Sequence, residues 1–224
     1  MSAPPQSEPA AVHRRPAESP AEPLFTALST ALAQPPEPAF LRALLAPEFL
    51  DGAAEFWGAE ADRHFRACAA RGTPEALADE LGPEFTRLFL VPGPQGLTPY
   101  ESVFREPRPG EARLWGPAAR EVQQWYRLAA LDIAPEFRDL PDHLALELAF
   151  VAALCQLEED FTKRRQPAKA RRAREIRRDF LRAHLLAWVP AWAGSLREKS
   201  AHPYFLALAA ALEPVCRWEL ARLE

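Results

Sequence analysis

Apolar residues recur at helical spacing along most of this chain, and prolines separate the periodic stretches. The clearest stripe has spacings of four, three and four residues: Leu144, Leu148, Val151 and Cys155. Just before it, Pro141 cannot lie inside a preceding helix, and the carboxylate of Asp142 can accept from the free amides of a first turn. The pattern therefore predicts a helix that is capped by Asp142 and runs to about Arg164.

The other stripes are shorter and carry their own start and stop signals. They predict helices over residues 24–33, 39–45, 53–71, 74–81, 84–90, 111–131, a segment that starts in a basic stretch and ends near 194, and 203–220. Thr73 is expected to cap the helix that starts at Pro74, and Gly82-Pro83 is expected to break the chain after it. Residues 91–110 are expected to lack regular structure. Since no period-two pattern typical of strands stands out, we expect an all-α fold, a single bundle-like domain of about nine or ten helices.

The composition agrees with a helical globular domain. Hydrophobic residues make up 48% and charged residues 26% of the chain, and 224 residues are enough to bury a full core. Alanine, leucine and arginine are abundant, which favours helices over strands. Residues 1–22 contain few large apolar side chains, so we expect a disordered tail rich in proline and alanine there and a folded domain over 23–224.

Charge and cysteine usage exclude several classes of function. The formal net charge of −4 argues against a general nucleic-acid binder. Cys68, Cys155 and Cys216 are far apart in apolar contexts, so we expect reduced core thiols and no disulfide or zinc site. No apolar run is long enough to span a bilayer, and Arg14-Arg15 is not followed by the hydrophobic segment of an export signal. We expect a cytoplasmic protein without membrane insertion, metal or cofactor.

Two stretches contain polar residues that a helix does not need for its own stability. His143 and Glu147 are four residues apart, so they share one helix face; such a pair is most often a weak surface interaction. Upstream, the segment from Glu84 to Pro94 runs into a second one with the sequence Leu97-Thr98-Pro99-Tyr100-Glu101-Ser102-Val103-Phe104.

Together these segments resemble the TorD/DmsD/NarJ family of redox-enzyme maturation chaperones. In that family a pattern like Glu-x-x-x-Leu-Phe, then Gly-Pro, then Pro-Tyr/Trp-x-Ser-Val, is followed further along by Pro-Asp-His-Leu-x-x-Glu-Leu. The matching segments here are 84–89, 99–103 and 141–148, in the same order, and 179–190 and 202–205 also fit. The resemblance extends over about Leu24 to Glu219.

The resemblance implies a chaperone with no catalytic residues. Family members share an all-helical fold and bind the twin-arginine leader of a molybdopterin-dependent oxidoreductase in the cytoplasm. They delay export until the molybdenum cofactor is inserted, and some also bind the enzyme body. Carried over by position, the leader-binding groove comprises Phe85, Leu88, Phe89, Pro99, Tyr100, Asp142 and His143, with Glu84, Glu101, Ser102 and Glu147 in support. Asp142 would meet the leader's arginines through charge-assisted hydrogen bonds.

Other interpretations stay open. Phe85, Leu88 and Phe89 have the spacing of a core face, and Asp142 has the alternative role of a helix cap alone. The whole protein has the alternatives of a nucleotide-binding or hydrolysing helical protein and of a binder of acidic partners through the basic segment 163–178, which is otherwise a solvated helix face. We expect a monomer, with a dimer formed by exchange of a helical half across residues 91–110 as the alternative.

Overall fold

The computed structural model describes residues 20–105, 116–133 and 139–224. Its helices are α1 (Ala21–Ala33), α2 (Pro38–Leu44), α3 (Pro47–Ala69), α4 (Pro74–Phe85), α5 (Glu101–Arg105), α6 (Pro117–Leu128), α7 (Leu144–Lys163), α8 (Pro167–Phe180), α9 (Leu186–Lys199) and α10 (Pro203–Leu223). Two π-helical turns, η1 (Thr86–Leu90) and η2 (Leu181–Leu185), extend α4 and join α8 to α9. The described residues form no strand, only an isolated bridge between Tyr100 and His143, so the prediction of an all-α fold is confirmed.

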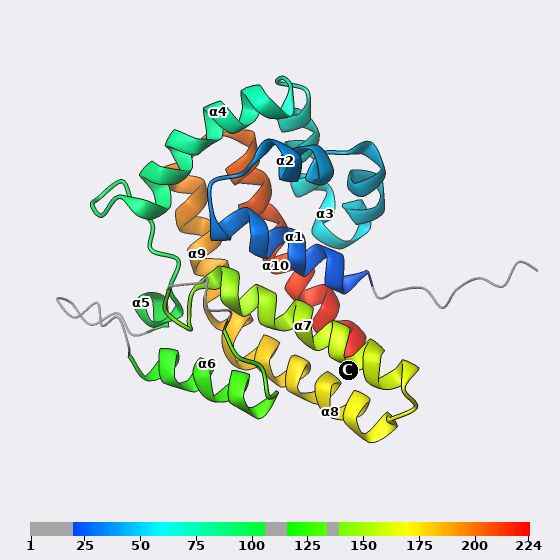
Figure 1. Ribbon diagram of the computed structural model, residues 1–224. Helices are drawn as coiled ribbons and strands as arrows, with labels where there is room; N and C mark the ends of the chain where they lie inside the picture. Colours follow the sequence, from blue (N-terminus) through cyan, green and yellow to red (C-terminus); the bar gives the residue numbers. More distant parts are fainter. Residues whose placement is uncertain (1–19, 106–115, 134–138) are drawn as a thin grey trace, which may run out of the picture.

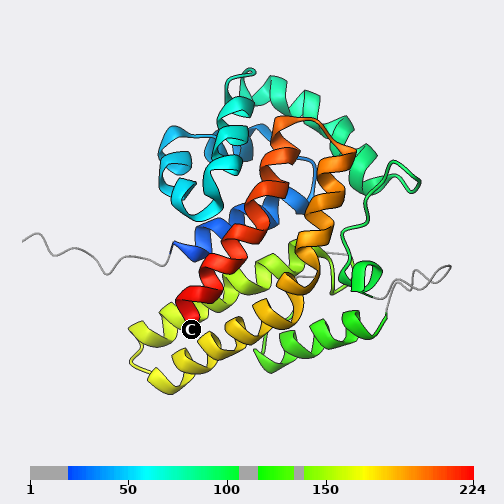
Figure 2. The same cartoon turned by 180° about the vertical axis from the view of Figure 1, so that it is seen from behind.

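Helix α10 runs through the middle of the bundle (Figure 1). It packs against α3, α9 and α1, while α7 packs between α1 and α8. From behind, α8, η2 and α9 form one long bent rod beside α10 (Figure 2). α10 carries its own buried apolar residues on nearly every face, as expected for a helix inside a bundle.

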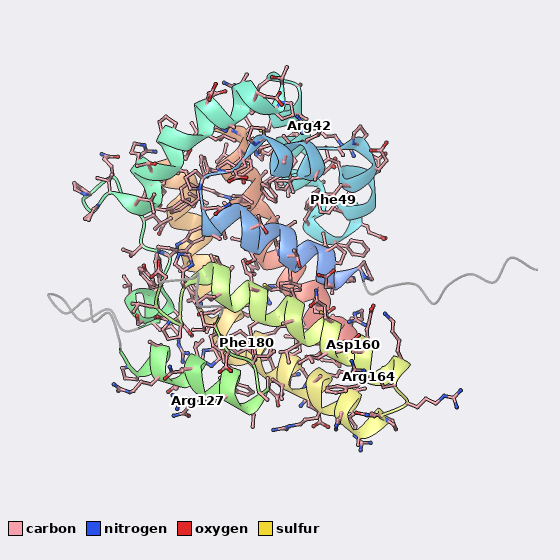
Figure 3. All side chains as sticks on the ribbon, viewed as in Figure 1. Arg42, Phe49, Arg127, Asp160, Arg164 and Phe180 are labelled. Carbon is pink, nitrogen blue, oxygen red and sulfur yellow. The ribbon has the colours of Figure 1, made fainter. Side chains whose placement is uncertain are left out.

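Side chains from several helices fill the spaces between these rods (Figure 3). Phe180 of α8 is buried, with its ring centroid 4.8 Å from that of Phe150 on α7 and 6.1 Å from that of Trp125 on α6. Arg127 on α6 and Arg164, the residue directly after α7, lie on the outside (Figure 3). One aromatic side chain thus holds α6, α7 and α8 together.

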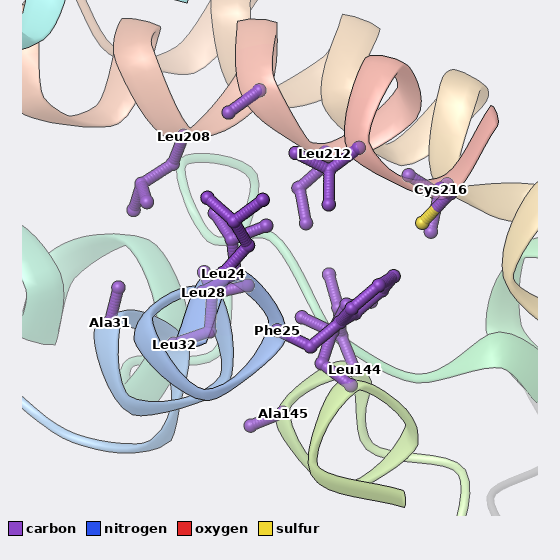
Figure 4. Close-up of a cluster of buried hydrophobic side chains, with 14 of the residues drawn as sticks. Leu24, Phe25, Leu28, Ala31, Leu32, Leu144, Ala145, Leu208, Leu212 and Cys216 are labelled. Atoms are coloured by element: carbon purple, nitrogen blue, oxygen red, sulfur yellow. The ribbon is translucent and has the colours of Figure 1, made fainter. Parts of the chain in front are cut away.

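A second part of the core lies where α1, α7 and α10 meet (Figure 4). Phe25, Leu144 and Leu212 converge there, and none of the three is exposed to solvent. The predicted stripe of α7, which begins at Leu144, is buried along its whole length. Because burying one such side chain stabilises the fold by roughly 1.5–3 kcal/mol, this contact fixes where the first turn of α7 lies.

The prediction that Gly82-Pro83 breaks the chain is wrong. Thr73 caps α4 as expected, accepting from Ala76 N at 3.3 Å, but the helix continues through Pro83. It then widens into η1, where Val91 N donates to Thr86 O at 3.0 Å, five residues back. Pro83 lies two residues before the end of α4, and it costs the helix the hydrogen bond that it cannot donate and a clash of its ring with the preceding turn, but the helix continues into η1.

Other boundaries also differ from the predictions. α3 begins at Pro47 and is kinked at Gly58, whose positive φ of 84° is accessible to glycine at little cost. Residues 91–110 were expected to be irregular, but α5 forms inside them. α9 continues past the predicted end near 194 to Lys199, and α1 starts at Ala21, within the expected tail. Residues 1–19, 106–115 and 134–138, including the start of the helix expected over 111–131, lie outside the described residues.

Candidate functional site

The two segments singled out in the sequence meet in the structure. Leu144 N donates to Pro99 O at 2.8 Å, and Glu101 N donates to Asp142 O at 3.0 Å. The rings of Tyr100 and His143 meet edge to face, with centroids 5.4 Å apart. These contacts attach the segment 99–102 to the start of α7, so residues some forty positions apart form a single unit, the 99–102/142–147 junction.

Asp142 does not cap α7, contrary to the prediction. The N-cap is His143, whose Nδ1 accepts from Ala145 N at 3.1 Å. The Asp142 carboxylate is fully buried and turns to the other segment, where its Oδ2 accepts from Ser102 N at 2.9 Å. Burial lowers the pKa of His143 to about 4, against the opposing effect of the Asp139 charge, so the ring is neutral and can accept as a cap.

Glu101 joins the junction to η2. Its Oε2 lies 2.8 Å from His184 Nδ1, and its Oε1 accepts from Arg105 Nη1 at 2.7 Å. Glu101 and His184 are buried, whereas the Arg105 side chain is about one third exposed. The carboxylate is therefore balanced by a cation at the edge of the protein and held in place by a buried imidazole.

Glu147 lies beneath the junction and does not form a surface pair with His143. It is fully buried, and its Oε2 accepts from Trp188 Nε1 of α9 at 3.2 Å. Burial and the nearby negative charge of Glu101 raise the pKa of Glu147 well above its ordinary value. A protonated Glu147 can donate to the Glu101 carboxylate, which removes the repulsion between the two acids.

The predicted apolar groove residues lie mostly in the core. Phe85 and Leu88 are buried, and Phe89 packs against Phe85, Trp192 and Phe205 with centroids 4.9, 5.9 and 6.0 Å apart. Their common face is turned toward α9 and α10, where Phe85 and Leu88 are closed off from solvent and Phe89 is partly buried. The alternative of core packing describes where they lie; their expected role in leader binding remains a prediction.

The exposed apolar side chains, Leu90 and Val91, lie immediately after them and were not among the predicted site residues. Leu90 is 60% and Val91 is 54% exposed, at the base of a loop that ends at Gly96. The loop is closed by Leu97 N donating to Leu88 O at 2.6 Å and is tied to α9 by Lys199 Nζ donating to Pro94 O at 2.7 Å. Two large apolar residues directly before Pro92-Gly93-Pro94 were the signal that could have identified them.

The backbone of this loop is compact at Gly96. A Cβ added to Gly96 would lie 2.7 Å from Val91 O, a contact with backbone that no side-chain movement could relieve. Glycine therefore permits the turn that presents Leu90 and Val91 to solvent. Figure 1 shows this loop projecting from the end of α4, away from the bundle.

The acidic side chains near the loop already have partners. Glu84 binds Arg87 and accepts from Ser200 Oγ at 2.8 Å, and the Arg87 hydrogen bond is the main cause of its lowered pKa. Asp139 is exposed at the rim of the junction, and its Oδ1 accepts from Tyr100 Oη at 2.6 Å. Of the acids named here, Asp139 is the one that faces solvent beside the predicted site.

The cysteines and the basic segment follow the predictions with one exception. Cys68, Cys155 and Cys216 are free and buried. The side chains of segment 163–178 are largely exposed, but Arg177 is fully buried, with its Nε 2.8 Å from Glu219 Oε1. Among the described residues, no group of three His, Cys, Asp or Glu side chains could hold a metal ion, and no helix is long and apolar enough to cross a membrane.

Known proteins match much of this chain. The family described as nitrate reductase delta subunit matches residues 53–194. The chaperone protein TorD of Psychrobacter sp. strain PRwf-1 is 30% identical over 114 residues, which are 51% of this chain and 48% of that protein. TorD of Shewanella pealeana is 27% identical over 172 residues, 70% of each chain, and TorD of Salmonella bongori is 25% identical over 132 residues, 59% of this chain and 53% of that protein.

The chain thus spans about half the length of two of these three relatives. All three are named as chaperones and not as enzymes, in agreement with the expectation from the sequence. The family match covers more than half of the chain. The chain therefore belongs to the nitrate reductase delta subunit family, the family of redox-enzyme maturation chaperones that its motifs resemble.

Proposed function

We propose that this protein is a chaperone that binds the leader peptide of a molybdopterin-dependent oxidoreductase, and in addition the body of its catalytic subunit. The observation that supports it is the exposed pair Leu90 and Val91, which lie nine and eight residues before Pro99, the first residue of the 99–102/142–147 junction. Exposed apolar side chains on a fixed loop suit the hydrophobic stretch of a leader, because binding removes apolar surface of both partners from water.

The leader's arginines need an accessible acid at the junction. Asp142 and Glu101 are buried and already form hydrogen bonds inside the protein, so neither is accessible to an arginine of the leader. Asp139 is exposed, and Tyr100 holds its carboxylate at the rim of the junction. In this proposal Asp139 receives an arginine through a charge-assisted hydrogen bond, while Asp142 and His143 fix the position of Tyr100 from below.

A bound leader is hidden from the export machinery, which is how a chaperone of this kind gives the client time to acquire its molybdenum cofactor in the cytoplasm. In this proposal the protein itself binds no cofactor and acts as a monomer. The family membership supports the coarser part, a chaperone for the maturation of a redox enzyme. Which oxidoreductase is the client depends on what co-purifies with the chain or is encoded beside it.

The proposal is tested by isothermal titration calorimetry with the leader peptide of that oxidoreductase. We expect binding with a negative heat-capacity change, the marker of apolar burial. Shortening the hydrophobic stretch of the peptide should weaken binding more than replacing one arginine. The opposite order would mean that recognition is mainly electrostatic, and that Leu90 and Val91 are not the main contact.

A further inference from the structure

A pocket on the far side of the bundle is not used by the proposed leader site. It has a volume of about 180 Å³ and lies where the end of α6 meets α7 and α8. Leu128, Leu157, Phe161 and Ile176 supply apolar walls, and Lys169 and Arg172 lie at its edge. An apolar pocket with a few charged groups at the rim is the usual form of a binding site.

Leu128 forms an exposed apolar edge of this pocket. It is 53% exposed, and the described residues include only two other large hydrophobic side chains with comparable exposure, Leu90 and Val91. The turn after α6 holds it there: Ala130 adopts a left-handed conformation with φ 54°, and Leu131 N donates to Tyr126 O at 3.0 Å. A left-handed alanine costs roughly 1–2 kcal/mol, so the chain maintains this turn against local strain.

The rim of the pocket belongs to the most basic stretch of the chain. Residues 163–178 contain nine lysines and arginines and one acid, in a chain whose formal net charge is −4. Among the described residues, Arg164, Arg165 and Arg171 are exposed and have no acidic partner. Nitrogen-tipped side chains point away from the bundle along α8 in Figure 3. This face attracts carboxylates and repels the arginines of a twin-arginine leader.

The two cations at the rim of the pocket, Lys169 and Arg172, have only weak partners within the protein. Lys169 Nζ lies 5.5 Å from the Phe161 ring centroid, and Arg172 lies 3.7 Å from Glu175 in a pair whose side chains are both about half exposed. An exposed pair of this kind contributes little free energy, so an incoming carboxylate can replace it. Lys169 also covers the ring of Phe161, which leaves that ring poorly placed to stack on a nucleic-acid base.

We propose that this pocket docks an acidic amphipathic segment of a client protein. One large apolar side chain enters the pocket beside Leu128, and flanking carboxylates meet Lys169 and Arg172. The segment differs from a twin-arginine leader in the sign of its charge, so this is a second surface that acts independently of the proposed leader site. A chaperone with two such surfaces binds its client by two weak contacts, and their combined affinity exceeds that of each.

The test uses a fluorescently labelled synthetic peptide with leucines on one helical face and glutamates beside them, followed by anisotropy. Leu128→Asp should weaken binding roughly tenfold or more, because it removes one buried apolar contact. Lys169→Glu combined with Arg172→Glu should weaken it several-fold, with an effect that shrinks as salt is added. Arg63→Glu on α3, also an exposed charge reversal, is the matched control and should leave binding unchanged.

Three further arms identify other occupants. A peptide with lysines in place of the glutamates should not bind, and a single-stranded oligonucleotide should not compete with the acidic peptide. Light scattering should give the same molecular mass for wild type and Leu128→Asp, which excludes a second copy of the chain as the occupant of the pocket. Absence of peptide binding, or equal binding by wild type and Leu128→Asp, overturns the proposal, as does an oligonucleotide that competes. Titration of the leader peptide into the same proteins separates the two sites. Leu128→Asp should not change the affinity for the leader, whether or not it changes the affinity for the acidic peptide.

Discussion

Glu101 and His184 meet 2.8 Å apart in the interior of the protein, and neither side chain reaches solvent. The contact connects α5 to the π-helical turn η2, and Arg105 adds a hydrogen bond of 2.7 Å from the edge. One carboxylate therefore fixes the relative positions of the 99–102 segment and the long rod formed by α8, η2 and α9.

Glu101→Gln should lower the free energy of unfolding by about 1–3 kcal/mol, because it removes the charge that His184 and Arg105 share and leaves imperfect hydrogen bonds inside the protein. Urea unfolding followed by circular dichroism measures this. The neighbouring substitution Ser102→Ala is the control: the Ser102 hydroxyl is buried without a hydrogen-bond partner among the described residues, so its loss should be nearly neutral. Equal stability of Glu101→Gln and Ser102→Ala would show that the buried contact is not what holds α5.

Glu147→Gln should change how stability depends on pH. The pKa of Glu147 is raised in the folded state, so its protonated form stabilises the fold at low pH, and that stability is lost as pH rises toward the folded pKa. Glutamine resembles the protonated acid at every pH. We therefore expect the variant to gain stability relative to wild type between pH 5 and pH 8.5, measured by urea unfolding. A constant difference over this range would mean that Glu147 is ionised in the fold.

The contribution of His143 to stability should depend on pH in the opposite direction to that of Glu147. Its folded pKa is lowered to about 4, so the neutral ring stabilises the fold at neutral pH, and this contribution is lost as pH falls from about 6.5 toward 4. Asparagine also caps helices but does not titrate. His143→Asn should be less stable than wild type at pH 7.5, and the difference should narrow at pH 5. His143→Ala should be destabilised by about a further 1 kcal/mol, since it removes the cap as well. Stability that is equal in the two variants would contradict the capping role.

The sequence was sufficient for the fold class and for most helix starts, because apolar stripes and prolines are local signals. It was not sufficient at Gly82-Pro83, since a proline disfavours a helix without always ending it, and α4 continues through Pro83 into η1. The cap was misassigned for a related reason. Asp142 is a better cap than His143 in isolation, but its carboxylate is drawn to Ser102 N, forty residues away in sequence.

The site was predicted from separate segments, and Pro99 and Glu101 contact the start of α7, while the role of these residues in binding stays a prediction. Which side chains face solvent could not be predicted. Phe89 and Leu90 are adjacent and both apolar, yet one packs on Trp192 and the other is exposed, because successive residues of a helix point about 100° apart.

Cys68, Cys155 and Cys216 should be unreactive in the native protein. Burial raises the pKa of the Cys68 thiol to about 11 and that of Cys155 to about 12, and it also raises the pKa of Cys216, so almost no thiolate forms at neutral pH. A colorimetric thiol reagent at pH 7.5 should react with fewer than one group per chain before denaturation and with three after it. Rapid reaction of the folded protein would place at least one thiol at an accessible position.

The most direct measurement compares leader binding by wild type and by the double variant Leu90→Asp, Val91→Asp in a calorimeter. Both side chains are exposed, so the double variant should keep the stability of wild type, while the affinity for the leader should fall roughly tenfold or more. Leu128→Asp, an equally exposed leucine on the far surface, should bind the leader like wild type. Leader binding at full affinity by the stable Leu90→Asp, Val91→Asp protein would contradict the proposed site.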